Sequence, residues 1–174
     1  PLVPEAKMEI PYDSAVILIL KALKPLGKKY VNDLKKGFNS RWVDVYETEG
    51  KGSGAYSWGA YSTHPYMLLN YNNTLDNVFT VAHEMGHNMH GLYSNRKQPY
   101  IYSGHSIFVA EVASITNEML LMDYLLKNAQ DKAQKLYLLN YYIEMIQGTF
   151  YTQVMFAEFE KEAHAKAEAG EALS

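Results

Sequence analysis

The chain has 174 residues, 48% of them hydrophobic and 20% charged, a balance typical of one soluble globular domain. The net charge of −3 leaves no basic excess to neutralise phosphates, so we expect no nucleic-acid partner. The absence of cysteine excludes disulfides and thiolate ligands and restricts any metal site to His, Asp and Glu. The longest apolar run, Ala15 to Leu20, is too short to span a membrane, and no signal-peptide pattern opens the chain.

The sequence opens with "PLVP" rather than methionine, and we expect it to be part of a longer protein. Residues 1–11 carry three prolines and predict an extended lead-in. Two helices are predicted next, over residues 12–24 and 25–38, with Pro25 tolerated in the first turn of the second. Residues 41–49 alternate weakly, which is compatible with a strand or a short helix.

Residues 50–61 are rich in glycine and aromatic side chains. They do not match a phosphate-binding loop, because no Gly-Lys-Ser/Thr opens a helix, and a glycine loop beside a strand is favoured. Residues 65–71 predict a short strand, and Pro65 at its start favours the edge of a sheet. An edge strand leaves backbone donors and acceptors free, so we expect an extended peptide to bind there.

The next predicted helix begins at Asn73 or Thr74, which are good N-terminal caps, and ends at Gly91. A loop over residues 92–104 follows, and then a long amphipathic helix over residues 106–127. The rest of the chain predicts one or two more helices. No repeat interrupts the pattern, so residues 1–174 are expected to form a single domain.

The stretch "FTVAHEMGHNMHG" places His83 and His87 four residues apart on the predicted helix. At about 100° per residue, the two imidazoles share one face and can reach one ion. Glu84 is turned toward a water on that ion. This His-Glu-x-x-His pattern is the zinc metallopeptidase motif. The chemistry it predicts is hydrolysis by a zinc-activated water, with Glu84 taking the proton and passing it to the leaving amine.

A catalytic zinc needs a third protein ligand. His90 lies near the same face, but three histidines over two turns of one helix cannot all point at one ion. The longer three-histidine motif is excluded, because it needs glycine and histidine where this chain has His90 and Tyr93. The following helix offers Glu111 and Glu118. A carboxylate among apolar residues is costly to bury unpaired, which favours Glu111 as ligand. Glu118 is favoured as the acceptor for a ligand histidine's other nitrogen, with an ordinary surface glutamate as the alternative.

The stretches "TLDNVFTVAHEMGHNMH" and "YIYSGHSIFVAEVASITNEMLL" resemble the zinc oligopeptidases of the oligoendopeptidase F and thimet oligopeptidase type, and the first branch fits best. The resemblance covers nearly the whole chain. It implies a mainly helical, zincin-like catalytic domain with a small sheet beside the cleft. It also implies one zinc held by His83, His87 and Glu111, Glu84 as general base, and cytoplasmic cleavage of short peptides in a deep, narrow cleft.

Further site residues are expected around these groups. His90 joins Glu118 as a residue behind the metal ligands. The glycine-rich residues 50–61, the predicted edge strand and the loop before Glu111 place a larger set near the substrate. These candidate substrate contacts are Gly54, Ala55, Tyr56, Tyr66, Leu68, Asn70, Tyr102 and His105.

The family has a helical region before this segment and a stretch after it, and the latter carries groups that stabilise the tetrahedral intermediate. Ser174 ends the chain before such a stretch. Because an oxyanion partner is worth on the order of a hundredfold in rate, we expect zinc binding but weak activity from the chain alone.

Three other interpretations compete with a metalloendopeptidase segment. They are a metal-binding piece without turnover, another zinc hydrolase with the same motif, and a helical interaction module without metal.

Overall fold

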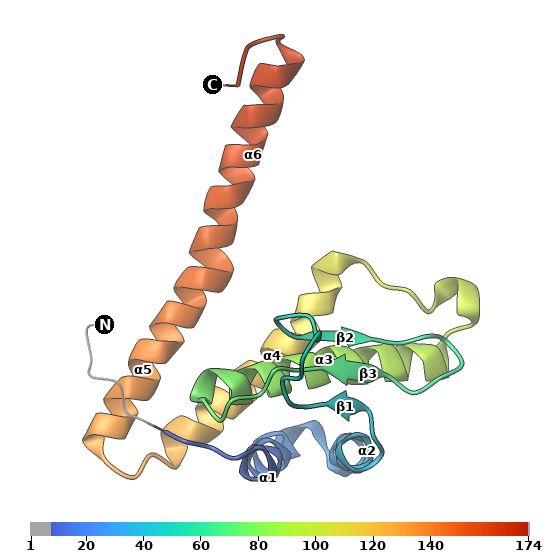
Figure 1. Cartoon of the computed structure of the whole chain (residues 1–174), viewed down its shortest axis with the longest axis vertical. Coiled ribbons are helices and arrows are strands. Elements are labelled where there is room, and N and C mark those ends of the chain that lie inside the picture. The colour runs from blue at the N-terminus through green and yellow to red at the C-terminus, as the bar shows by residue number, and fades with distance from the viewer. Residues whose placement is uncertain (1–7, 174) are drawn as a thin grey trace. The chain divides into compact units, whose positions relative to one another are not determined.

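The computed structural model describes residues 8–173, which form two compact units, one up to Asn128 and one from Ala129 onward. The elements of the first unit (Figure 1) are α1 (Tyr12–Ala22), the 3-10 helix η1 (Lys24–Leu26), α2 (Lys28–Asn39), β1 (Val43–Asp44), β2 (Tyr56–Trp58), β3 (Tyr66–Leu68), α3 (Leu75–Lys97), the 3-10 helix η2 (Tyr100–Tyr102) and α4 (Ile107–Lys127). Those of the second are α5 (Lys132–Ile146), the π-helical turn η3 (Gln147–Tyr151) and α6 (Thr152–Glu168). The expected mainly helical fold with a small sheet is confirmed. The single domain over residues 1–174 stays a prediction, and most of the expected lead-in lies outside the described residues.

The core of the first unit is built on α3, which packs along α4 and carries the small sheet on another side. Its apolar residues recur at helical spacing, so one continuous stripe is removed from water. Burying such side chains stabilises the fold by about 1.5–3 kcal/mol each. The buried residues of the two helices include Val78, Val81, Ala82, Met85, Met89, Leu121 and Met122.

The sheet has the order β1-β3-β2, so β3 is the central strand. It pairs in parallel with β1, where Val43 faces Met67, and antiparallel with β2, where Ser57 faces Met67. The expectation that the strand after Pro65 lies at an edge is therefore wrong. Proline is also tolerated directly before a central strand, because the ladder begins only at the next residue. The edge strand that contacts α3 is β2, and it pairs with β3 on one side only among the described strands.

Two predicted helix boundaries also differ from the structure. Gly91 does not end α3, which continues to Lys97, because Leu92 is buried and extends the apolar stripe. Tertiary packing thus outweighs the low helix propensity of glycine, which is about 1 kcal/mol. The predicted second helix is divided at Gly27, whose φ of 93° is outside the helical region. Pro25 lies in η1 before that break.

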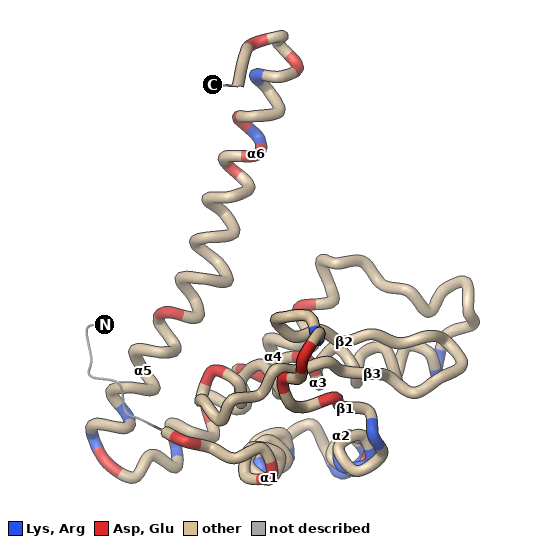
Figure 2. Tube along the Cα trace, in the orientation of Figure 1, with Lys and Arg blue, Asp and Glu red and all other residues tan. Residues whose placement is uncertain are grey.

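An ionic cluster around Asp33 joins α2 to α3. The Oδ2 atom of Asp33 accepts hydrogen bonds from Lys29 (3.0 Å), Arg96 (2.9 Å) and the hydroxyl of Tyr93 (3.1 Å). Partial burial raises the pKa of Asp33, but the bonds from Lys29, Arg96 and Tyr93 outweigh it and hold that pKa below its usual value. Figure 2 shows basic residues gathered on α2 near this cluster.

No helix in the described part of the chain is both long enough and apolar enough to cross a membrane.

Candidate metal centre

The helix that carries the motif begins at a well-formed cap. Thr74 has an extended backbone, and its hydroxyl accepts a hydrogen bond from the backbone N–H of Asn77 at 3.2 Å. Asp76 in the first turn places negative charge at the positive end of the helix dipole. The cap predicted at Asn73 or Thr74 is thus formed by Thr74. From this fixed start, His83 and His87 fall on one face of α3.

A close approach of α3 and α4 brings the remaining groups to the histidines. It is made at Gly86, where an added Cβ would lie 2.5 Å from the Cα of Ser114 and 2.8 Å from the carbonyl oxygen of Ala113. Only glycine leaves room for backbone so near. The hydroxyl of Ser114 also donates to Oε2 of Glu111 at 2.8 Å, which orients that carboxylate.

Three ligand atoms converge at this point. The Nε2 atoms of His83 and His87 lie 3.1 Å apart. Oε2 of Glu111 is 3.3 Å from the first and 3.5 Å from the second. The Glu111 side chain is 48% exposed and the two imidazoles are 28% and 21% exposed, so the cluster opens to solvent on one side. These atoms form a group of suitable size and chemistry to hold one metal ion.

The ring of His83 is held from behind by Glu118. Its Nδ1 lies 2.5 Å from Oε1 of Glu118, whose residue is only 8% exposed. A proton held on Nδ1 leaves the lone pair of Nε2 directed at the site. Burial lowers the pKa of His83, but the hydrogen bond and charge of Glu118 outweigh it and raise that pKa. Burial and the charge of His83 lower the pKa of His87.

The costly buried carboxylate of α4 is therefore Glu118 and not Glu111, which is half exposed. The cost of burial therefore does not favour Glu111 as the ligand. Glu118 is next to a histidine, and this contact compensates for its burial.

Glu84 is buried beside the ligands. It is 8% exposed, and within the described residues its Oε2 has no hydrogen-bond partner. An unpaired buried carboxylate oxygen is unfavourable by several kcal/mol unless a proton, water or substrate group meets it. The backbone oxygen of Glu84 accepts from the hydroxyl of Ser57 at 2.6 Å, which ties β2 to α3 at the level of the site.

A second line of contacts supports α3 from α4 and α2. Asn117 donates to the backbone oxygen of Ala82 at 2.9 Å, and the hydroxyl of Tyr30 donates to Asn117 at 3.0 Å. Burial raises the pKa of Tyr30 to about 12, so its hydroxyl stays protonated and can donate. Sequence reasoning missed Ser57, Asn117 and Tyr30, because each acts through a contact between elements far apart in the chain.

The other predicted residues divide into groups. Gly54, Ala55 and Asn70 share the lining of one cavity of about 230 Å³ near the start of α3. Asn70 also donates to the carbonyl oxygens of Gly52 and Gly54, both at 2.9 Å, so it fixes the glycine loop.

Tyr66 and Leu68 belong to the central strand β3, and Tyr56 lies exposed on β2. Tyr102 is exposed in η2, and His105 stacks on His90 with the ring centres 3.9 Å apart. The substrate roles of these residues and the supporting role of His90 stay predictions.

The donor set fits a zinc ion. Two imidazole nitrogens and one carboxylate oxygen are the ligands of many catalytic zinc sites, and no thiolate is needed. Glu118 fixes Nδ1 of His83, which leaves Nε2 of that ring available to a cation. Within the described residues the oxygen Oε2 of Glu84 has no partner and could meet a water or a substrate group beside that cation. The three side chains are therefore chemically suited to hold one metal ion, and zinc as its identity stays a prediction.

Comparison with known proteins gives consistent results. The sequence model of peptidase family M3 matches residues 5–174. Oligopeptidase PepF of Bacillus subtilis is 53% identical over the whole chain, and an oligoendopeptidase F homologue of Lactococcus lactis is 45% identical over 94% of it. The chain spans about a quarter of the length of these relatives, 26% and 27%.

Two solved structures share the fold. One, of a Chlamydophila abortus protein described as a peptidase, has a TM-score of 0.85 at 46% identity and covers 98% of this chain and 28% of that one. The other, of oligoendopeptidase F from Enterococcus faecium, has a TM-score of 0.57 at 30% identity and covers 100% of this chain and 22% of that one.

Proposed function

The chain belongs to peptidase family M3, and on that premise we propose that it provides the metal-binding and proton-transferring part of a zinc-dependent oligoendopeptidase. The observation that carries the proposal is the convergence of His83, His87 and Glu111 beside the unpaired carboxylate oxygen of Glu84. The names of the relatives, oligopeptidase and oligoendopeptidase F, support short peptides as the substrate class. Zinc is the proposed cofactor, one ion per chain, because its preferred ligands are those present.

Each residue has a separate task in this proposal. His83, His87 and Glu111 hold the ion, and Glu118 keeps the Nδ1 proton of His83 in place so that Nε2 faces the metal. Zinc bound there supplies a Lewis acid that polarises the scissile carbonyl and favours ionisation of water. Glu84 receives the proton of the attacking water at Oε2 and delivers it to the nitrogen of the leaving amine. Glu84 is buried, which limits its contact with bulk water.

The peptide is proposed to lie along the open side of β2. Among the described strands, β2 pairs only with β3, so its outer backbone groups are available to an extended chain. Ser57 in the middle of this strand bonds to Glu84, which places the strand beside the general base. This arrangement replaces the expectation that the peptide pairs with the segment Tyr66 to Asn70. We also propose a cytoplasmic location, on the family resemblance alone.

The test is zinc content together with hydrolysis of a short labelled peptide. We expect about one zinc per wild-type chain, loss of zinc in Glu111→Ala, and retention of zinc with at least a hundredfold lower rate in Glu84→Gln. Glu144→Gln, an exposed carboxylate on α5, is the control and should behave as wild type. Zinc retained in Glu111→Ala would refute the ligand set. Full zinc without peptide cleavage in the wild type would favour a metal-binding piece without turnover.

A further inference from the structure

A second cavity, separate from the metal centre, lies where the end of α2, the loop over residues 59–65 and the last third of α3 meet. It has a volume of about 370 Å³. Arg96, on its wall, is nine residues beyond His87 on α3, which is about 13 Å along the axis and half a turn around it. The cavity therefore opens on a different side of the helix from the ligands. Its polar lining includes Lys36, Ser40, Ser62, Thr63, Asn95 and Arg96.

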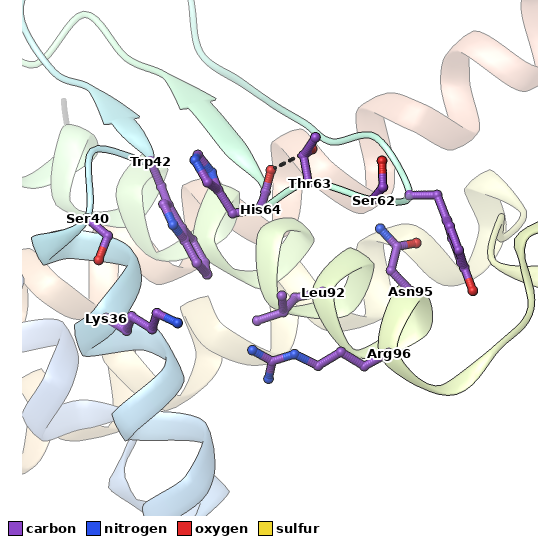
Figure 3. A pocket seen from close by; sticks show the side chains of 10 residues that line it. Lys36, Ser40, Trp42, Ser62, Thr63, His64, Leu92, Asn95 and Arg96 are labelled. Atoms are coloured by element: carbon purple, nitrogen blue, oxygen red, sulfur yellow. Dashed lines mark hydrogen bonds between the residues drawn. The ribbon is translucent and has the colours of Figure 1, made fainter.

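Two cationic side chains from different helices, Lys36 of α2 and Arg96 of α3, line this cavity. Figure 3 shows the ammonium group of Lys36 and the guanidinium group of Arg96 extending toward each other below Leu92. Arg96 gives one terminal nitrogen to Asp33 at 2.9 Å and keeps its other donors. Lys36 has no ion pair or hydrogen bond within the described residues, and no carboxylate lines the cavity.

Asp33 does not balance this charge. Its Oδ2 already accepts hydrogen bonds from Lys29, Tyr93 and Arg96. The single negative charge of Asp33 is therefore shared by the two cations Lys29 and Arg96, and the charge of Lys36 is additional. The rest of α2 is also basic, with Lys28, Lys29, Lys35 and Lys36 against the single Asp33. The local charge is therefore positive in a chain whose net charge is −3.

Neutral hydrogen-bond donors also line the cavity, together with the imidazole of His64. The hydroxyls of Ser40 and Ser62 and the amide of Asn95 have no partner within the described residues, and Figure 3 shows Ser62 and Asn95 on the same side of the cavity. The hydroxyl of Thr63, in contrast, is occupied by backbone groups of its own turn. The lining thus combines two charged donors with three free neutral donors and contains no carboxylate, while Asp33, which pairs with Arg96, lies outside it.

We propose that this cavity binds a small oxyanion, either a phosphate or a carboxylate. Planar guanidinium and point-charge ammonium groups are the side chains that bind such oxygens most strongly, and hydroxyl and amide donors supply the remaining bonds. An oxyanion here bridges α2, α3 and the loop 59–65, which leads from β2 to β3. The site is independent of the metal centre, so it can be tested without metal and without catalysis.

A tryptophan in the cavity wall allows binding to be followed by fluorescence. Trp42 is part of the lining and 4% exposed, whereas Trp58, the other tryptophan of the chain, is 73% exposed. In a Trp58→Phe background the fluorescence therefore reports on Trp42 alone. Inorganic phosphate and acetate are titrated separately at constant ionic strength, with chloride as the ionic-strength control, and calorimetry is run in parallel in case the fluorescence does not respond.

We expect saturable binding of phosphate, acetate or both with a dissociation constant of about a millimolar. Lys36→Gln should weaken it about tenfold, the loss of one charge-assisted bond. Lys35→Gln is the matched control, because Lys35 is also exposed on α2 but does not line the cavity. Saturation by phosphate alone assigns a phosphate ligand, saturation by acetate alone assigns a carboxylate ligand, and saturation by both assigns the wider oxyanion class. The proposal is overturned if neither method detects saturation beyond the chloride control, or if Lys36→Gln and Lys35→Gln bind alike.

Discussion

The contact at Gly86 makes the strongest prediction, because an added methyl group there meets backbone and not a movable side chain. Gly86→Ala would place its Cβ 2.5 Å from the Cα of Ser114, whereas ordinary contacts begin at about 3.4 Å. The only relief is a separation of α3 from α4 by several tenths of an ångström. That separation moves Glu111 and Glu118 away from His83, since the carboxylates and the histidine are on opposite sides of the contact.

The expected magnitudes follow from this geometry. Overpacking of a well-packed contact costs about 1–3 kcal/mol of the free energy of unfolding. For a chain of this size, each kcal/mol lowers the melting temperature by about 2–4 °C. Displacing a ligand and the acceptor behind another ligand should also weaken zinc binding by about 10- to 100-fold. The two effects are expected together, because one contact positions both the core and the site.

The measurements are thermal unfolding without metal and competitive zinc titration. Gly91→Ala is the matched control: it lies five residues further along α3, and nothing stands within 4 Å of its added Cβ. Because alanine has the higher helix propensity, this variant should be unchanged or more stable by up to about 1 kcal/mol. Equal stability and equal zinc affinity of the two variants would refute the argument that the Gly86 contact sets the distance between the helices.

Three further predictions use other parts of the structure. Glu118→Gln should lower zinc affinity about 10- to 100-fold in a competition titration, while Asp123→Asn on the exposed side of α4 should leave it unchanged. Asp33→Asn should lower stability by about 1–2 kcal/mol near neutral pH in denaturant unfolding. Because folding lowers the pKa of Asp33, its contribution is complete above the unfolded value of about 3.9 and is lost as pH falls through the lower folded value, so the two proteins should converge in acid. Thr74→Ala should cost about 1 kcal/mol in the same assay through loss of the cap, and an unchanged midpoint would contradict that role.

The local part of this structure could be predicted from the sequence. A spacing of four residues fixes the relative position of His83 and His87 on any helix, and Thr74 supplies the cap that starts it. The spacing of seven residues puts Glu111 and Glu118 on one stripe of the following helix, and the structure places Glu118 against His83. The spacings need only the geometry of one helix, whereas the contact between Glu118 and His83 depends on how α3 and α4 pack.

The remaining features depend on contacts that no local pattern encodes. The order of three strands is decided by pairing across the chain, so Pro65 could not distinguish an edge strand from a central one. Continuation of α3 past Gly91 depends on burial of Leu92 by other elements. The hydroxyl of Ser57 belongs to a glycine-rich stretch with no helical or strand periodicity, and its partner is 27 residues away.

Under the proposed function, the hydroxyl of Ser57 affects which peptides can be cut. Because Ser57 joins β2 to the backbone of Glu84, the strand and the carboxylate are held in one register. A peptide that pairs with β2 through its main chain is then aligned with the proton acceptor by backbone geometry, whatever its side chains are. The position of cleavage would be chosen by distance along the strand, and tolerance of many amino-acid sequences would follow from the same bond.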